Sequence, residues 1–247
     1  MPISPNQGST GGGTTVTITG VNLANASAVK FGSKLATITA NTPTSVTVGS
    51  PSGAGVVDVT VTTSGGTSNP LSFFYIGAPF KSALGATSGP TAGGNTVTIN
   101  GTGLFTASTV NFGANAATPT VISDNQLSVA VPTGAGPGTV SVSVTTAGGT
   151  NNGLSYTYVD TPTVTTLSPN SGSDDGGTAV TITGTNLSTT QSITFDGAPA
   201  PFTAANSTSV IAITPPGSAG AVDVVVTTTG GSATEVGGFT YLGGPGI

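Results

Sequence analysis

Apolar and polar residues alternate along much of the chain. In residues 15–19, Val16 and Ile18 alternate with threonines, and in "VDVTV" (57–61) three valines alternate with Asp and Thr. A period of two places one face of a β-strand in a core and the other in water. Gly-Gly pairs and prolines recur between such segments, about every eight to twelve residues, and no stretch has a helical stripe. The pattern predicts a sandwich of short antiparallel strands, about seven in each folded unit.

One unit is written three times. The phrase "ISPNQGSTGGGTTVTITG" at residues 3–20 returns in altered form at residues 84–101 and 167–184. Each copy continues with a Leu, a Phe before a turn Gly, a Pro, a β-branched segment ending in Gly-Gly, and two closing aromatic residues. The repeat length of about 80 residues is that of a small domain. The sequence therefore predicts three domains, at residues 1–78, 79–160 and 161–247.

Most aromatic residues occupy places shared by the three copies and are expected in the cores. These are Phe31, Phe112, Phe195, Phe73, Tyr75, Tyr156, Tyr158, Phe239 and Tyr241. Phe202 aligns with Ile38 and is expected in a core as well. Phe74, Phe80 and Phe105 fit no shared place, so they are the interaction candidates. They either pack between the first two domains or form an exposed binding patch.

The repeated phrases also resemble a known family. "SPNQGSTGGGTTVTITGVNL", followed by "VKFG", "VDVTVTTSGG" and the aromatic pair, resembles the IPT/TIG family of immunoglobulin-like domains. The resemblance covers nearly the whole chain. It implies three early-set immunoglobulin-like β-sandwiches without an inter-sheet disulfide, and its bacterial and phage surface members are the expected type. The second copy departs from the pattern at Gly85-Ala86, where the others have Ser-Pro. Family membership does not imply one activity, because a fold hosts many functions.

The composition excludes several functions. Three Lys and no Arg stand against eight carboxylates, with a net charge of −5. Binding to nucleic acid or to an anionic membrane needs clustered cations, so neither partner is expected. The chain has no Cys and no His, and it has no apolar run of about 18 residues, so we expect no disulfide, no cofactor and no membrane insertion. No signal peptide is visible in this chain.

The candidate metal ligands are weak. Asp174 and Asp175 form a carboxylate pair in one turn, but Ca²⁺ requires six or more oxygens and no calcium-loop spacing is present. We therefore expect a solvated turn there, with a weak Ca²⁺ site as the alternative. The glycine-rich phrases precede strands and not helices, so they are expected to be turns and not phosphate loops.

No set of residues suggests catalysis. Without His, the only candidate bases are Lys30, Lys34, Lys81 and scattered carboxylates. Lys30 lies out of phase with its apolar neighbours and is expected in water. Asp58 and Asp223 share a repeat position on the outward phase of a strand, where they favour solubility or edge protection. The chain is therefore not expected to be an enzyme.

The linkers predict an extended arrangement. Residues 75–84 and 158–167 are short and contain Pro79 and Pro162, and such joints limit bending. We expect a semi-rigid rod with a structural or adhesive role at the outside of a bacterium or on a phage particle, bound to another surface or virion protein or to itself. The alternative is a carbohydrate-binding module of a secreted glycan-active protein. The sequence also suggests head-to-tail assembly into a fibre, because "YLGGPGI" (241–247) repeats the start of the first linker, "YIGAPFK" (75–81).

Overall fold

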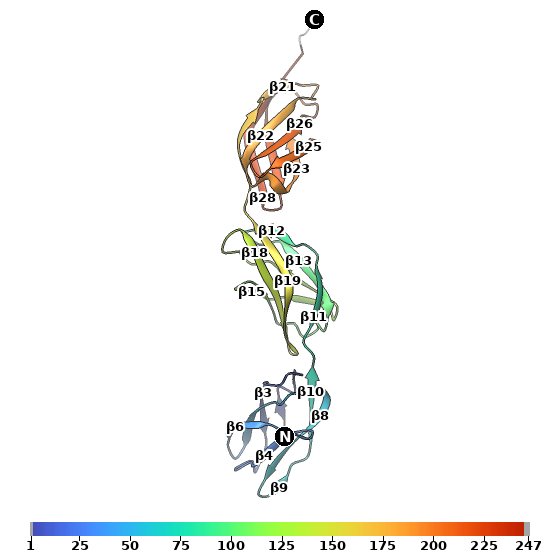
Figure 1. Cartoon of the computed structure of the whole chain (residues 1–247), viewed down its shortest axis with the longest axis vertical. Coiled ribbons are helices and arrows are strands. Elements are labelled where there is room, and N and C mark those ends of the chain that lie inside the picture. Colours follow the sequence, from blue (N-terminus) through green and yellow to red (C-terminus); the bar gives the residue numbers. More distant parts are fainter. Residues whose placement is uncertain (1, 245–247) are drawn as a thin grey trace. The chain divides into compact units, whose positions relative to one another are not determined.

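A computed structural model describes residues 2–244, and of residues 204 and 205 it describes only the backbone. The described residues form six β-sheets, two in each repeat, so the chain consists of three β-sandwich domains in tandem (Figure 1). This confirms the all-β class expected from the alternating pattern. Within the described range, no helix has the length and hydropathy that a membrane-spanning segment requires.

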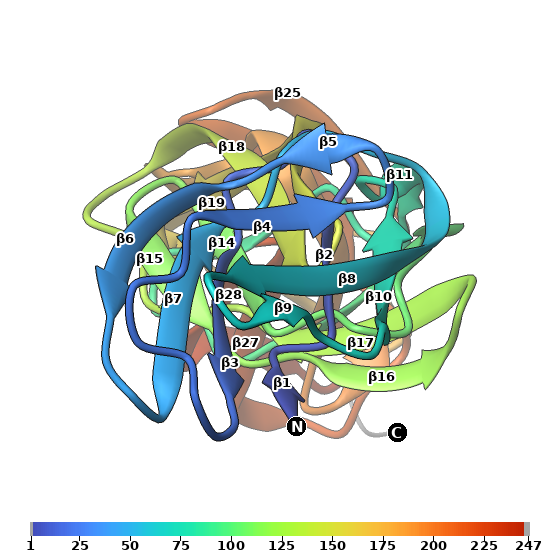
Figure 2. The same cartoon turned by 90° about the horizontal axis from the view of Figure 1, so that it is seen from below.

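The first domain contains a four-stranded sheet and a second sheet of six strands. The four-stranded sheet has the order β1 (Ile3–Ser4), β3 (Thr15–Thr19), β7 (Ser45–Gly49) and β6 (Thr37–Asn41). The other has the order β2 (Gln7–Ser9), β10 (Leu71–Ile76), β8 (Gly55–Thr63), β4 (Ala28–Phe31) and β5 (Lys34–Leu35), and β9 (Gly66–Thr67) also pairs with β8. In the view from below, in which the first domain lies in front, β3, β7 and β6 form one layer, and β4 and β8 belong to the other (Figure 2).

The second domain repeats this plan. Its four-stranded sheet has the order β11 (Phe80–Leu84), β13 (Thr96–Thr102), β17 (Gln126–Ala130) and β16 (Thr120–Ser123). Its five-stranded sheet has the order β12 (Ser88–Pro90), β19 (Gly149–Val159), β18 (Gly138–Thr146), β14 (Thr109–Phe112) and β15 (Asn115–Ala117).

The third domain has the same two sheets and a short 3-10 helix, η1 (Leu187–Thr189). Its four-stranded sheet has the order β20 (Thr163–Ser168), β22 (Ala179–Thr185), β26 (Ser209–Ile213) and β25 (Phe202–Asn206). Its five-stranded sheet has the order β21 (Ser171–Ser173), β28 (Gly231–Leu242), β27 (Gly220–Thr228), β23 (Thr190–Phe195) and β24 (Ala198–Pro199).

The described part of each domain has more strands than the seven expected. The opening segment of each copy forms two strands, because it crosses from one sheet to the other, and a short strand (β5, β15 or β24) adds a further one. In the first domain β1 pairs antiparallel with β3, and β2 then pairs parallel with β10 in the facing sheet. The other two copies make the same crossing. The second domain does so without the Ser-Pro of its neighbours; a methyl group on its Gly85 would collide with the Thr98 side chain.

The cores are built from the residues that alternate inward. In the first domain, Val16, Ile18, Phe31 and Val59 belong to one buried cluster, as the period of two predicts. The Phe31 ring packs edge-on against Phe73, with 5.0 Å between the ring centroids. The third domain repeats this arrangement, with Phe195 against Phe239 at 5.3 Å.

Each domain also closes its core with a tyrosine. The hydroxyl groups of Tyr75, Tyr158 and Tyr241 donate to the backbone oxygens of Pro51, Pro132 and Pro215, at 2.7, 2.8 and 2.7 Å. Burial raises the pKa of all three phenols. Each proline follows shortly after the end of a strand and presents the carbonyl that satisfies a buried hydroxyl group.

Candidate functional site

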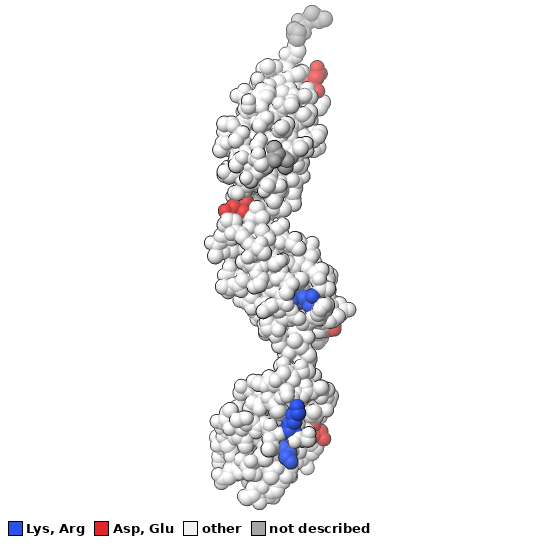
Figure 3. Space-filling view, in the orientation of Figure 1, with Lys and Arg blue, Asp and Glu red and all other residues white. Residues whose placement is uncertain are grey.

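Charged side chains are few on the visible face: basic and acidic ones lie near one another on the first domain, and most of the remaining visible surface is neutral (Figure 3). Lys30 is exposed on β4, and Asp58 and Asp223 point outward from β8 and β27, as their alternation predicts. Asp223 accepts a hydrogen bond from the Gly237 backbone N–H at 2.8 Å. These three side chains therefore belong to the solvated face of their strands.

Asp174 and Asp175 lie in the turn after β21. The backbone carbonyl of Asp174 accepts from the Gly217 N–H at 2.9 Å, and the Asp175 N–H donates to Ser173 Oγ at 3.1 Å. Within residues 2–244, no third acidic side chain joins them in a group that could hold a metal ion. The turn is thus held by hydrogen bonds to the Ser173 side chain and to the Gly217 backbone, and the weak Ca²⁺ site stays an untested alternative.

Lys81 is the one lysine that the described structure buries. Its side chain is 7% exposed, and its Nζ donates to the Val142 backbone oxygen at 2.6 Å. Burial lowers the pKa of this amine to about 8. In the third domain Val164 takes the equivalent place and packs against the core. Sequence reasoning named Lys81 only as a possible base and missed its burial, although the comparison with Val164 was a signal.

The three aromatic interaction candidates are exposed. The exposed fractions of the Phe74, Phe80 and Phe105 side chains are 42%, 62% and 73%. The loop that carries Phe105 is held by Asp124, whose carboxylate accepts from the backbone N–H groups of Gly103 and Phe105 at 3.2 and 3.3 Å. The structure therefore presents Phe105 from an anchored loop, an arrangement that the sequence did not predict.

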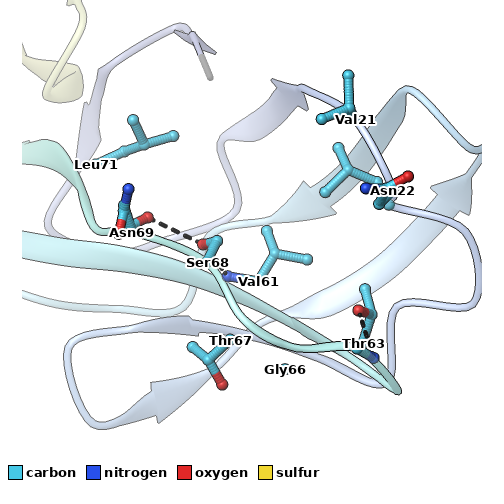
Figure 4. A pocket seen from close by; sticks show the side chains of 11 residues that line it. Val21, Asn22, Val61, Thr63, Gly66, Thr67, Ser68, Asn69 and Leu71 are labelled. Carbon is cyan, nitrogen blue, oxygen red and sulfur yellow. Dashed lines mark hydrogen bonds between the residues drawn. The ribbon is translucent and has the colours of Figure 1, made fainter.

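A cleft of about 350 Å³ lies at one end of the first domain (Figure 4). Val21 and Asn22 lie on one side of it, and the hairpin around Gly66 and Thr67 lies on the other. The buried side chain of Val61 lies between them. The remaining lining residues are Leu23, Thr63, Gly65, Ser68, Asn69 and Leu71.

The cleft carries apolar surface and hydrogen-bonding groups, but no charge. Val21, at its rim, is 77% exposed although it is a large apolar residue. Asn22 adopts a left-handed backbone conformation, with φ 59, and its side-chain amide makes no hydrogen bond to another of the residues 2–244. Such a surface suits a neutral extended backbone better than an ion. The sequence did not predict this cleft.

A second cleft of about 480 Å³ lies elsewhere in the first domain, beside Tyr75 and Lys34. The Lys34 ammonium group donates to the Ser52 backbone oxygen at 2.8 Å and contacts Ser52 Oγ at 3.2 Å. The ammonium group is thus held against Ser52 of the neighbouring loop. This cleft contains no acidic group or second cation that would indicate chemistry.

Comparisons with known proteins agree with this architecture. The model of the family described as "IPT/TIG domain" matches residues 1–75, 79–158 and 162–241. A search of curated proteins finds no match.

Among solved structures, the plexin A4 extracellular region is similar, with a TM-score of 0.50 and 20% identity; the alignment covers 93% of this chain and 22% of plexin A4. A Bacteroides ovatus surface glycan-binding protein in complex with a mixed-linkage heptasaccharide has a TM-score of 0.32 and 17% identity, over 96% of this chain and 65% of that one. The Escherichia coli adhesin FdeC has a TM-score of 0.33 and 16% identity, over 97% of this chain and 92% of that one.

These likenesses concern the fold. The chain spans less than a quarter of the plexin chain that it matches. At these identities the plexin match shows only that immunoglobulin-like sandwiches occur in tandem in both proteins. These matches therefore do not indicate a function for this chain.

Proposed function

Because the chain belongs to the IPT/TIG family over three tandem domains, we propose that it is a non-catalytic structural or adhesive rod at the outside of a bacterium or a phage particle. The observation that carries this proposal is repetition without a repeated chemical site. The three copies share core residues, turn glycines and the tyrosine–proline contact, and all of these serve the fold.

The composition of the surface supports the same role. Only 4% of residues are charged, and solubility rests on Ser, Thr, Asn and Gly. A surface of this kind offers no electrostatic attraction for nucleic acid or anionic lipid. It suits a spacer or a presenter of contacts, whose partners are another surface or virion protein or a second copy of the chain.

Microscopy of the native source tests this role. An antibody against the purified chain, used for immunogold labelling, should mark the outside of intact cells or particles. Labelling confined to the cell interior would contradict the proposal. A broad hydrolase panel is the matched test for the absence of catalysis, because activity lost on substitution of one carboxylate would show an active site.

A carbohydrate-binding function is the second candidate, and the exposed Phe105 ring favours it. Sugars commonly stack on exposed aromatic rings, and Asp124 holds the loop that presents this one. A glycan array should then give a signal that Phe105→Ala abolishes and the matched variant Leu35→Ala, at an exposed apolar position of the first domain, retains. No binding to any glycan would remove this candidate and leave the structural one.

A further inference from the structure

The outer face of the six-stranded sheet in the first domain carries a group of side chains that the other two domains lack. Strand β10 places Phe74 on this face, and β8 places Val56 directly opposite it; we call these two residues the apolar pair. Their exposed fractions are 42% and 61%. Asp58 on β8 and Lys30 on β4 are exposed on the same face, and Leu35 on β5 is 65% exposed. Apolar and charged side chains of both signs thus share one exposed surface.

The strand register arranges these side chains in a diagonal row across the sheet. Asp58 is the next outward residue after Val56 on β8, and Thr60 is the one after that. Lys30 lies directly opposite Thr60 on β4, and Leu35 lies directly opposite Lys30 on β5. The row therefore has a fixed order: the apolar pair, a carboxylate, an ammonium group and a second apolar side chain.

The two charges of the row are not used inside the domain. The side chains of Asp58 and Lys30 make no hydrogen bond or ion pair with another of the residues 2–244. Lys34 differs in this respect, because its ammonium group is held against Ser52. Asp58 and Lys30 are therefore both available to a partner.

The other two copies show that the fold does not require this row. In the second domain Thr157 and Thr139 take the places of the apolar pair, and their hydroxyl groups are hydrogen-bonded to each other at 2.9 Å. The residues aligned with the apolar pair in the third domain are Thr240 and Ala221, and those aligned with Lys30 and Leu35 are Asn111 and Ala116 in the second domain and Thr194 and Pro199 in the third. The exposed ring, the aliphatic side chains and the lysine are thus specific to the first domain.

The row is complementary to itself. A two-fold axis that lies in the plane of the face, between Asp58 and Lys30, reverses the order of the row in the second copy. Each Asp58 then faces a Lys30, and the apolar pair of each copy faces Leu35 of the other. Any other partner would need the same groups in the same reversed order, so a second copy is the occupant that this pattern favours.

We propose that this face of the first domain binds the same face of a second copy, so that the chain forms a weak two-fold dimer. The apolar contacts lie at both ends of the row, and two pairs of Asp58 with Lys30 lie between them. The proposal deepens the proposed structural role, in which a second copy is one of the partners, by naming the surface that joins the copies.

The size of the face sets the expected strength. Five strands about 4.8 Å apart, each about six residues of about 3.3 Å, cover about 400–500 Å². Two copies together would bury roughly 800–1,000 Å², which is less than the roughly 1,200 Å² at which stable interfaces begin. Exposed ion pairs add little affinity, and they act mainly on the choice of orientation. The dimer should therefore form only at high concentration.

Sedimentation equilibrium of the full chain tests the apolar contact. The weight-average mass should rise toward that of a dimer between about 10 μM and 1 mM. Phe74→Thr should abolish the rise without harm to the fold, because threonine is the residue that both other domains have at this place. Phe105→Ser is the matched control: it replaces another exposed ring, outside this face, by the residue that aligns with it in the third domain. This variant should associate as the unmodified chain does.

An exchange of the two charges tests the orientation. Lys30→Asp and Asp58→Lys should each weaken the association several-fold, because each variant places like charges opposite one another. The chain with both substitutions should associate about as strongly as the unmodified chain, since every pair then keeps opposite signs. A surface that merely prefers a certain net charge would not recover in the doubly substituted chain.

Cross-linking tests the position of the axis. Thr60 lies beside both Asp58 and Lys30, so the proposed axis passes close to it. The chain has no Cys, so Thr60→Cys introduces a single thiol. Packed sheets lie about 10 Å apart, so a short bismaleimide, and not a direct disulfide, should link two copies. Ser143→Cys, at the aligned place of the second domain, is the control and should give no dimer.

Three results would overturn the proposal: a full chain that stays monomeric over the whole range, association that Phe74→Thr leaves intact, or a doubly substituted chain that associates no better than the single variants. None of them touches the proposed surface role, which immunogold labelling tests separately. Labelling confined to the cell interior would contradict that role and leave the measured dimer standing.

Discussion

Replacing Lys81 by Met should stabilise the second domain at neutral pH. The lysine side chain is buried, and its only described hydrogen bond is donated to the Val142 backbone oxygen. Methionine has a similar length and no charge to desolvate. The third domain already has an apolar residue, Val164, at this place. The substitution therefore brings the second domain closer to the packing of the third.

The expected magnitude follows from the pKa of Lys81. Burial lowers it from 10.5 to about 8, and each pKa unit corresponds to about 1.4 kcal/mol, so the cost of keeping the amine charged is at most about 3.5 kcal/mol. Water near the ammonium group and the lost hydrogen bond reduce the gain from Met to about 1–2 kcal/mol. Between pH 8 and 10.5 the unfolded chain holds a proton that the folded chain has lost, so stability rises with pH in this window.

Calorimetry of the full chain at two pH values tests this reasoning. At pH 7, Lys81→Met should raise one of the transitions by about 5–10 °C, since 1 kcal/mol corresponds to about 4–8 °C in a domain of this size. At about pH 10 the difference from the unmodified chain should be much smaller, because the lysine is then largely neutral in the fold. Lys30→Met, at an exposed position, is the control and should change neither value. A difference equal at both pH values, or a destabilisation at pH 7, would refute the account.

Three further predictions concern the cores and the acidic turn. Phe31→Ala should cost the first domain about 3–5 kcal/mol, and a change below about 0.5 kcal/mol in denaturant unfolding would show that the ring is not a core residue. Tyr158→Phe should cost about 1 kcal/mol in the same assay, because it leaves the Pro132 oxygen without its hydroxyl donor. Chelators should leave the melting temperature unchanged; a clear drop on calcium removal would identify Asp174 and Asp175 as ligands.

The sequence predicted the cores well because burial in a strand follows a period of two. Alternation places Val16 and Ile18 in the core, the place that the three copies share adds Phe31, and the structure buries all three. Phe202 was assigned by its alignment with Ile38, and both pack against the cores of their domains. Side-chain alternation is a local property, so a local pattern is enough to predict it.

The crossing of the first strand and the cleft could not be predicted in this way. Whether β1 and β2 lie in one sheet or two depends on the partners of the backbone, and the side-chain period is the same in both cases. The cleft around Gly65 depends on how the neighbouring backbone passes the turn. The same Gly-Gly pair lies against other backbone in the third domain, so its sequence alone does not predict the cleft.

Positions at which the three copies differ are therefore more informative about function than those at which they agree. Shared residues such as Tyr75 and Tyr158 make the same contact in each domain, so they explain the fold and nothing specific to one copy. Phe105 aligns with Ala24 and Ser188, which shows that the fold does not require an aromatic ring there. If the carbohydrate-binding proposal is correct, a substitution of this exposed ring, which an anchored loop holds, should alter glycan binding and leave stability unchanged.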